Sequence, residues 1–323
     1  MNKLQNKSPL VSVIIPTYNR ANYLQEALES VFRQNYHNFE IIVVDDGSTD
    51  DTRKIIDKYQ DKIKYFWQDN SGPSVARNLG IKNSQGELIA FLDSDDLMLP
   101  DRLSLQVSKF LKNPRLGLVG GSYLLIDSKS NPIGECKLSW IDRHRLKNGI
   151  HYRNFFSTTV VMIRKACVEK VGGFSSDFSF GEDWDLWLRI IQDYQFEYII
   201  TPIGIVRRHE DSIVGSMDPY NFVQWDELID REYNRSIINS NYNKIQANSI
   251  RKKQISFMLA NRGWVRSKKM DRGAREDVVM SIFFWPWWGL WRYRSVSRYF
   301  FDKKLLNHIN IWRAFFKKIA KFY

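Results

Sequence analysis

The chain has 323 residues, of which 43% are hydrophobic, and it carries a net charge of +12. This length and apolar content exclude a globally disordered chain and fit one large domain with an extension. The two cysteines, Cys136 and Cys167, lie far apart without disulfide or metal-site spacing, so reduced thiols are expected.

The positive charge is concentrated near the C-terminal end. Residues 241–323 contain 19 lysines and arginines against four acidic residues, whereas the remainder has a net charge of −3. A near-neutral body with a basic tail predicts an anionic surface as the tail's partner. The polar start shows no signal-peptide pattern, and no run of about 20 apolar residues is long enough to span a bilayer. We therefore expect a cytoplasmic protein.

The first part of the chain alternates between strand and helix patterns. Apolar runs predict strands at Leu10–Ile15, Phe39–Val44, Ile63–Trp67 and Leu88–Leu92. Helical spacing of apolar residues predicts helices between these runs, among them one with Leu24, Ala27, Leu28, Val31 and Phe32 on one face. This alternation predicts an α/β fold, a three-layer α/β/α sandwich.

The pattern changes from Leu116 onward. Strands are predicted at Leu116–Ile126, Thr158–Ile163 and Tyr198–Val206, with the polar stretch 127–154 as a loop or lid. The predicted organisation is a polar tail (1–9), one domain (10–215), a helical extension (216–275) and a basic aromatic segment (276–323). Within the domain we expect a nucleotide-binding half (10–115) and an acceptor and catalytic half (116–215).

Polar side chains follow three predicted strands: Thr17-Tyr18, Asp45-Asp46 and Asp93-Ser94-Asp95-Asp96. Open α/β sheets bind ligands just beyond the carboxyl ends of their strands. Alternating carboxylates there suit a hard cation, Mg²⁺ or Mn²⁺, that shares its coordination with a substrate phosphate. The alternative is an acidic turn that caps the predicted helix Asp101–Leu111. No Gly-x-Gly-x-x-Gly or Walker loop follows the first strand, which disfavours a redox dinucleotide or a P-loop nucleotide.

Five motifs occur in order: Val-Ser-Val-Ile-Ile-Pro-Thr-Tyr-Asn, Val-Val-Asp-Asp-Gly-Ser-Thr-Asp, Ala-Arg-Asn-x-Gly, Asp-Ser-Asp-Asp and Gly-Glu-Asp-Trp-Asp-Leu-Trp. With them the chain resembles family 2 glycosyltransferases of the GT-A fold, from residue 10 to about residue 213. The resemblance implies a mixed, mostly parallel sheet. It also implies metal-dependent, inverting transfer of a sugar from a nucleotide-diphospho-sugar, with UDP as the expected carrier.

The resemblance also implies roles for residues of the donor site. Asp46 is expected to bind the base, with Thr17 and Tyr18 beside the ring, and Arg77 to lie near the base or the diphosphate. Asp93 is expected to contact the ribose or the metal. The alternatives are that Asp46 only begins a helix and that Arg77 lies on a solvated helix face.

Asp95 is expected to ligate the cation, and His209 resembles the histidine that completes the metal site in some family members. The alternative for His209 is a solvated surface residue. Asp183 is the expected general base, because a single displacement needs one carboxylate opposite the leaving group. The alternative for Asp183 is a helix start rich in acids. Asp96 is expected to cap the following helix.

The basic tail contains an uncharged aromatic stretch, residues 278–291, followed by clustered cations. This pattern is typical of a segment that lies on an anionic membrane surface. A buried helical subdomain or an oligomer contact is the second interpretation, and binding of single-stranded nucleic acid is the least favoured.

Together these features favour a glycosyltransferase that is peripheral on the cytoplasmic face of the membrane. Its expected acceptor is a glycan or a lipid-linked molecule in cell-surface polysaccharide synthesis. One alternative is a non-catalytic interaction protein whose basic tail binds an anionic polymer or partner. Another is a nucleotidyltransferase, which the missing glycine- and lysine-rich phosphate loop disfavours.

Overall fold

The computed structural model describes residues 8–138, 150, 154–178 and 181–209, and the single residues 231, 251, 252 and 255. The chain divides into two units, of which the first comprises Met1–Ile150 and Asn154–Ser216. The four single residues belong to the second unit. Otherwise the predicted helical extension and membrane-surface segment lie outside the described residues, and the predicted domain boundaries stay a prediction.

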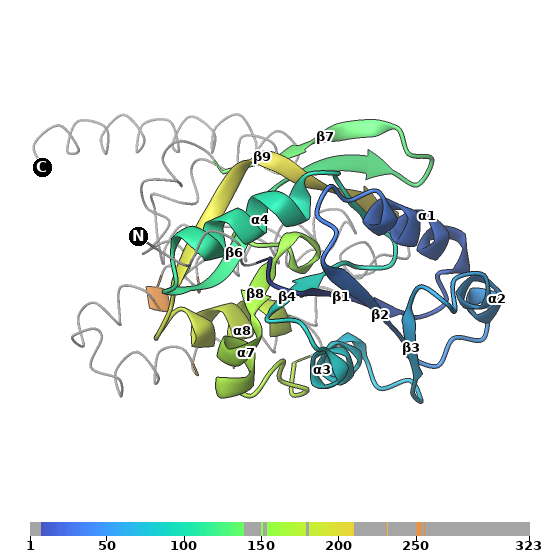
Figure 1. Cartoon of the computed structure of the whole chain (residues 1–323), viewed down its shortest axis with the longest axis horizontal. Coiled ribbons are helices and arrows are strands. Elements are labelled where there is room, and N and C mark those ends of the chain that lie inside the picture. Colours follow the sequence, from blue (N-terminus) through green and yellow to red (C-terminus); the bar gives the residue numbers. More distant parts are fainter. Residues whose placement is uncertain are drawn as a thin grey trace, which may run out of the picture. The chain divides into compact units, whose positions relative to one another are not determined.

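Four parallel strands form the first part of the sheet, in the order β3-β2-β1-β4 (Figure 1). Their bounds are β1 Val11–Thr17, β2 Phe39–Asp45, β3 Lys64–Trp67 and β4 Leu88–Phe91. Each ends within two residues of its predicted end. Because they run in one direction, their polar C-terminal residues meet at one edge.

The sheet continues beyond β4 in the order β8-β6-β9-β5, and β7 pairs with β6. The bounds are β5 Leu97–Met98, β6 Leu116–Asp127, β7 Pro132–Cys136, β8 Met162–Arg164 and β9 Gln195–Arg208. Strands β5, β7 and β8 are antiparallel to their neighbours, whereas β6 and β9 pair in parallel. Six of the nine described strands therefore share one direction, which confirms the predicted mixed, mostly parallel sheet.

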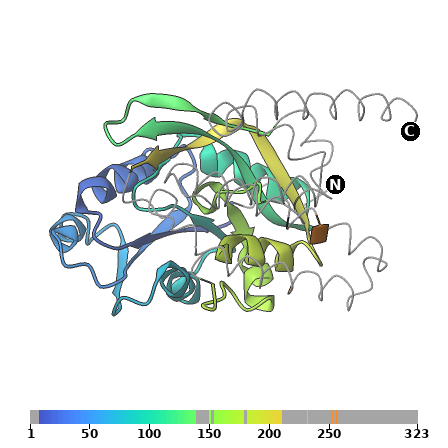
Figure 2. The same ribbon diagram turned by 180° about the vertical axis from the view of Figure 1, so that it is seen from behind.

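Helices cover both faces of this sheet (Figure 2). One apolar cluster joins α1 (Ala21–Phe32), α2 (Thr52–Asp57) and α4 (Arg102–Lys112) to residues such as Val13 and Ile15 of β1. The intervening Ile14 belongs to a second cluster with α3 (Pro73–Asn83), α7 (Lys165–Lys170) and α8 (Glu182–Ile190). Since successive side chains of a strand point to opposite faces, this division gives the predicted three-layer sandwich.

The predicted helix faces pack as their spacing requires. Leu24, Ala27, Leu28 and Val31 of α1 are all fully buried against the sheet. On the other face α3 lies close to β1, because a Cβ added at Gly80 would come within 2.5 Å of the Cγ2 atom of Ile14. Gly80 thus brings α3, and with it Arg77, close to the edge of the sheet.

Two predictions for the second half were wrong. The predicted strand Thr158–Ile163 begins as a 3-10 turn, η1 (Thr158–Val160), and only β8 is extended. The carbonyls of Thr159 and Val161 accept hydrogen bonds from the buried guanidinium of Arg102, and Gln106 donates to the carbonyl of Val160. These side-chain donors satisfy the carbonyls of Thr159 and Val160, and at Val161 they add to the backbone bond from Phe91 of β4.

The stretch 127–154 was predicted as a loop, but its first part forms β7. A tight turn precedes it, in which Asp127 accepts backbone hydrogen bonds from Lys129 and Asn131 and Ser130 adopts a positive φ of 66°. Strand β7 is almost wholly exposed and lacks an apolar alternation, so its sequence carries no strand signal. In the described part of the chain, no helix combines the length and apolarity that crossing a membrane requires.

Candidate functional site

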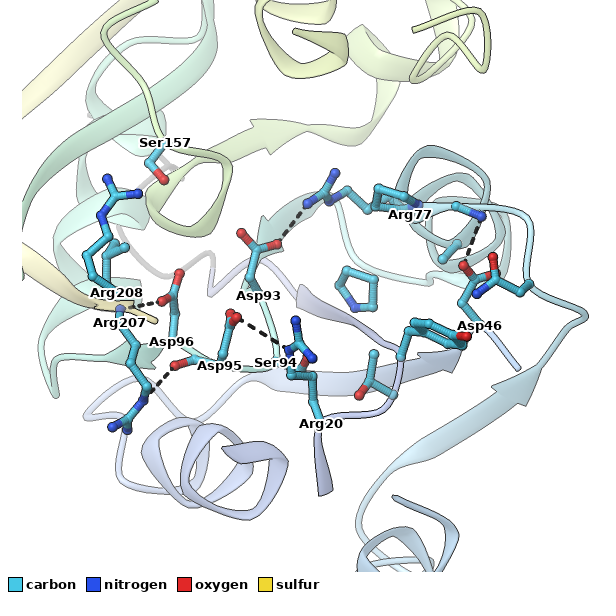
Figure 3. A pocket seen from close by; sticks show the side chains of 18 residues that line it. Arg20, Asp46, Arg77, Asp93, Ser94, Asp95, Asp96, Ser157, Arg207 and Arg208 are labelled. Atoms are coloured by element: carbon cyan, nitrogen blue, oxygen red, sulfur yellow. Dashed lines mark hydrogen bonds and ion pairs between the residues drawn. The ribbon is translucent and has the colours of Figure 1, made fainter. Parts of the chain in front are cut away.

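A cleft of about 460 Å³ opens at the carboxyl ends of β1, β2 and β4 (Figure 3). Six of the eight predicted site residues line it: Thr17, Tyr18, Asp46, Arg77, Asp93 and Asp95. The other two do not line it but contact its wall: His209 contacts Asp95, and Asp183 binds Thr158, the residue after Ser157 of the lining. Parallel strand ends therefore bring together residues from four of the five sequence motifs.

Asp46 lies at the right-hand end of the cleft in Figure 3 and is 5% exposed. Its Oδ1 accepts hydrogen bonds from the Gln68 side chain (2.6 Å) and the Ser71 backbone (2.8 Å), and its Oδ2 accepts one from the Gly72 backbone (2.8 Å). A carboxylate has about four acceptor positions, so one position remains at Oδ2. Helix α2 begins only at Thr52, so Asp46 is not a helix start.

Thr17 and Tyr18 flank this end of the cleft. The Thr17 hydroxyl is buried and has no hydrogen-bond partner among the described residues, whereas Tyr18 is 45% exposed. A buried hydroxyl without a partner is costly unless a ligand satisfies it. A ring-shaped ligand with polar edges fits between an exposed aromatic ring and these acceptors.

Asp45 is turned away from the cleft and holds the chain together. It accepts hydrogen bonds from the Ser48 backbone (2.8 Å) and the Tyr65 hydroxyl (3.0 Å). The following Gly47 has a φ of +82°, and a Cβ there would lie 2.9 Å from the backbone nitrogen of Asn70. Asp45 and Gly47 thus shape the turn that presents Asp46.

Arg77 is buried in α3 and connects the two halves of the sheet. Its guanidinium donates to Asp93 Oδ1 (2.8 Å) and Glu182 Oε1 (3.1 Å) and lies over the Phe174 ring. Burial lowers the pKa of Arg77, but the facing carboxylates of Asp93, Glu182 and Asp183 outweigh it and raise that pKa. The alternative of a solvated helix face is therefore wrong for Arg77.

Asp95 lines the cleft, and His209 lies beside it. The Nε2 atom of His209 lies 2.9 Å from Asp95 Oδ2, and the Arg20 Nε atom is 3.7 Å from the same oxygen. His209 is 95% buried at its side chain and packs beside the Tyr23 ring, so it is not a solvated surface residue. The Asp95–His209 contact joins the loop after β4 to the end of β9, across 114 positions of sequence.

Asp96 does not cap the following helix, contrary to the prediction. Asp101 occupies the N-cap position of α4, and Asp96 Oδ1 accepts a hydrogen bond from the Arg207 backbone (2.8 Å). Burial, together with Asp95 and Asp93, raises the pKa of Asp96 well above its usual range. Asp96 therefore fixes the acidic loop to β9.

The acidic loop, residues 93–96, could hold a divalent cation only together with a bound substrate that supplies further ligands. Among the described residues no group of three histidine, cysteine or acidic side chains converges as a metal site. Asp95 and His209 nevertheless bring one carboxylate and one imidazole to the same point, with Asp93 in the same loop. Mg²⁺ and Mn²⁺ are commonly held by one or two such side chains, with phosphate oxygens completing the coordination.

Asp183 stands at the start of α8 in a polar network. Its Oδ2 accepts hydrogen bonds from Asn154 (2.9 Å) and Thr158 (3.3 Å), and its Oδ1 accepts one from the Trp184 backbone (2.6 Å). Thr158 directly follows Ser157, which lines the cleft. Burial and the adjacent Glu182 raise the pKa of Asp183 to about 7, despite its hydrogen bonds and Arg77. Such a carboxyl is suited to exchange a proton near neutral pH.

The cleft residues that were not predicted include Arg20, Ser157, Arg207 and Arg208. Arg207 donates to Glu26 of α1 (2.8 Å), to Ser130 (2.7 Å) and to the Asp95 carbonyl (3.2 Å). Arg20 directly follows the first strand-end motif, and the pair Arg207-Arg208 precedes His209. Arginine side chains at the ends of predicted strands were thus the sequence signal that could have identified these cleft residues.

Residues 12–172 match the family model described as glycosyl transferase family 2. A relative from Escherichia coli, the UDP-Glc:alpha-D-GlcNAc-diphosphoundecaprenol beta-1,3-glucosyltransferase WfgD, is 35% identical over 190 residues. The match covers 57% of this chain and 70% of WfgD. The chain belongs to glycosyltransferase family 2.

The uncharacterized glycosyltransferase RT0329 of Rickettsia typhi is 37% identical to this family 2 member over 197 residues, or 59% of the chain. The match spans only 61% of RT0329.

Two solved structures share the fold. Staphylococcus aureus TarS 1–349 in complex with UDP-GlcNAc has a TM-score of 0.60 at 19% identity, over 85% of this chain and 80% of that one. Mannosyltransferase PcManGT from Pyrobaculum calidifontis, in complex with GDP-Man and Mn²⁺, has a TM-score of 0.57 at 18% identity, over 86% and 76%. At these identities the likeness shows the GT-A fold alone.

Proposed function

We propose that this glycosyltransferase is metal-dependent and inverting, and that it moves a sugar from a UDP-sugar to a hydroxyl of a glycan or lipid-linked acceptor in cell-surface polysaccharide synthesis. One observation carries the proposal. Three carboxylates in different environments gather around one cleft: Asp46 with an acceptor position to spare, Asp95 beside His209, and Asp183 with a pKa raised to about 7.

The nucleotide binds at the Asp46 end. The remaining acceptor position of Asp46 takes the N3–H of uracil, the Thr17 hydroxyl finds its partner in the base, and Tyr18 lies against the ring. Arg77, between Asp93 and Glu182, presents a fixed cation toward the ribose and diphosphate. The complexes of TarS with UDP-GlcNAc and of PcManGT with GDP-Man support a nucleotide-sugar donor.

Asp95 and His209 would hold a Mn²⁺ or Mg²⁺ ion, with Asp93 at the ribose or the ion. The cation would neutralise the charge that grows on the leaving nucleoside diphosphate. The complex of PcManGT with both GDP-Man and Mn²⁺ supports this assignment. The Tyr23 ring and the Asp96–Arg207 bond hold the two ligands in place.

Asp183 removes the proton from the attacking acceptor hydroxyl. The acceptor oxygen forms a bond to the anomeric carbon while the bond from that carbon to the diphosphate oxygen breaks, and the electron pair leaves with the diphosphate. One displacement inverts the anomeric configuration. Asn154 and Thr158 orient the carboxylate, and Glu182 is held by Arg77 and does not compete for the acceptor.

The acceptor class rests on the relatives and on the tail. The name of WfgD includes a diphosphoundecaprenol-linked GlcNAc, and a Bacillus subtilis relative is described as a putative teichuronic acid biosynthesis glycosyltransferase. The basic aromatic segment 276–323 would bind the anionic cytoplasmic face of the membrane, where lipid-linked acceptors reside.

Donor hydrolysis tests this proposal. Purified full-length protein is incubated with UDP-, dTDP- and GDP-sugars in Mn²⁺ or EDTA, and Mn²⁺ binding is followed by electron paramagnetic resonance. We expect a UDP-sugar to be consumed only with metal, and Asp95→Ala to lower both turnover and Mn²⁺ binding by about 100-fold. Asp57→Ala, which removes an exposed carboxylate of α2, serves as the matched control. Turnover that is unaffected by EDTA and by Asp95→Ala would contradict metal dependence.

A further inference from the structure

Arg208 is a cation of the cleft without an anionic partner. It ends β9 and lines the cleft, and its side chain has no carboxylate within ion-pair distance and no hydrogen-bond partner in the described part of the chain. Its charge lowers the pKa of the nearby Tyr123 against the stronger raising effect of burial. An arginine directed into a cleft without a partner is available to a ligand.

The other three arginines of the cleft are each held by carboxylates. Arg20 lies 3.7 Å from Asp95, Arg77 bridges Asp93 and Glu182, and Arg207 binds Glu26 at 2.8 Å. Their charges are balanced within the protein. Arg208 therefore differs from them in the one property that favours an anionic ligand.

Arg208 also points to a different side of the cleft from Arg207. Figure 3 shows the two side chains leaving β9 in opposite directions, Arg207 toward α1 and Arg208 toward Ser157. Such alternation is expected of successive residues of a strand. Ser157 precedes Thr158, which donates to Asp183. Arg208 thus faces the segment that holds the general base, whereas the base-binding Asp46 lies at the opposite end of the cleft.

We propose that Arg208, with Ser157 beside it, binds a phosphoryl group of the acceptor. This inference rests on the proposed function, because it needs an acceptor that enters beside Asp183 and carries phosphate. A guanidinium fork pairs with two phosphate oxygens at once and so fixes orientation as well as affinity. The site would place the acceptor hydroxyl toward Asp183, and it would select phosphate-bearing acceptors over uncharged glycans.

The donor diphosphate is the other phosphate that could reach Arg208, and the experiment separates the two. Full-length protein with Mn²⁺ is first titrated with UDP, and the UDP-loaded protein is then titrated with hexyl phosphate or with uncharged hexyl glucoside, followed by calorimetry. Hexyl phosphate is also titrated without UDP. The variants are Arg208→Gln, Arg208→Lys and, as a matched loss of charge outside the cleft, Arg33→Gln, whose arginine pairs with Glu29 on α1.

Hexyl phosphate should bind UDP-loaded wild-type protein and the Arg33→Gln variant equally, and Arg208→Gln about tenfold more weakly, the loss expected for one charge-assisted pair. Arg208→Lys should retain part of the affinity. Hexyl glucoside should not distinguish Arg208→Gln from wild type, and UDP should bind both alike.

A tenfold loss of UDP affinity in Arg208→Gln would assign Arg208 to the donor and overturn the proposal. So would equal binding of hexyl phosphate to Arg208→Gln and wild type, or no binding to UDP-loaded wild type. If UDP binds neither wild type nor any variant, the proposed donor is contradicted. The titration with hexyl phosphate in the absence of UDP would then still show whether Arg208 binds phosphate.

Discussion

The two ends of the cleft are built in different ways. At the nucleotide end Asp46 binds Gln68, Ser71 and Gly72, which lie 22 to 26 positions away in the sequence. At the catalytic end, Arg77 meets Glu182 and Asp95 meets His209 over 105 and 114 positions. The nucleotide end is therefore formed within one strand-helix-strand region. The catalytic end needs α8 and the end of β9, which come from the second half of the described domain.

This contrast indicates which contacts can tolerate change. Two of the three donors to Asp46 are backbone N–H groups, of Ser71 and Gly72, so its geometry depends on only one other side chain, that of Gln68. Side chains from separate elements hold Asp183 and His209, and each depends on its neighbours. We therefore expect substitutions at the nucleotide end to alter donor affinity. Those at the catalytic end should alter rate, pH dependence and metal binding while donor affinity without metal is preserved.

The largest effect is expected for the general base. Asp183→Asn should lower the rate of transfer about 1,000-fold while UDP affinity stays within threefold of wild type, because loss of a positioned base removes about 10²- to 10⁴-fold. Glu182→Gln is the matched control and should cost about tenfold or less, since it keeps the general base and changes only the contact with Arg77 and the charge that raises the pKa of Asp183. Single-turnover transfer and calorimetry with UDP measure the two quantities. A larger loss of transfer rate in Glu182→Gln than in Asp183→Asn would identify Glu182 as the general base instead.

The second effect concerns Asp46 and its neighbour. Asp46→Asn puts an amide NH₂ among three hydrogen-bond donors, so at least one bond is lost and UDP should bind about 10- to 100-fold more weakly. Asp45→Asn should change UDP affinity less than threefold, because the Tyr65 hydroxyl can turn to accept from the new amide. Calorimetric titration of both variants gives the comparison. Equal losses would mean that the acidic pair only shapes the turn.

The sequence predicted the nucleotide end better than the catalytic end. The parallel strands, the three-layer sandwich and the cleft position of Asp46 follow from apolar runs and strand ends, which are local signals, whereas the position of Arg77 was implied by the family resemblance. The partners of Asp183 could not be predicted, because Asn154 and Thr158 lie in segments predicted as a loop and a strand. Thr158 begins η1, whose carbonyls are held by Arg102 and Gln106 of α4. The spacing of apolar residues along the sequence does not predict hydrogen bonds between such distant side chains and backbone groups.

The pH dependence of transfer should follow Asp183. Its pKa of about 7 means that the base is protonated in acid, so kcat should fall tenfold per pH unit below about pH 7 and level off above it. Asn154→Ala removes a hydrogen bond that lowers this pKa, so the midpoint should move to higher pH. Rates at saturating donor and acceptor between about pH 5.5 and 8.5 provide the profile. If the midpoint stays unchanged in Asn154→Ala, a group other than Asp183 is responsible for the pH dependence of kcat.

The smallest effect is expected at Tyr23, which touches neither substrate nor metal. Its ring lies 5.3 Å from the His209 ring and 4.7 Å from the Arg207 guanidinium, so it supports both residues that β9 brings to the acidic loop. Tyr23→Leu removes the ring and should weaken Mn²⁺ binding about three- to tenfold, the range expected for an aromatic contact of this kind. Tyr23→Phe keeps the ring and should bind Mn²⁺ as wild type does. Paramagnetic resonance of Mn²⁺ with UDP present measures both variants, and UDP affinity without metal should not change in either. If Tyr23→Phe loses as much as Tyr23→Leu, the hydroxyl and not the ring supports His209, and the catalytic end depends on one more polar contact across the sheet.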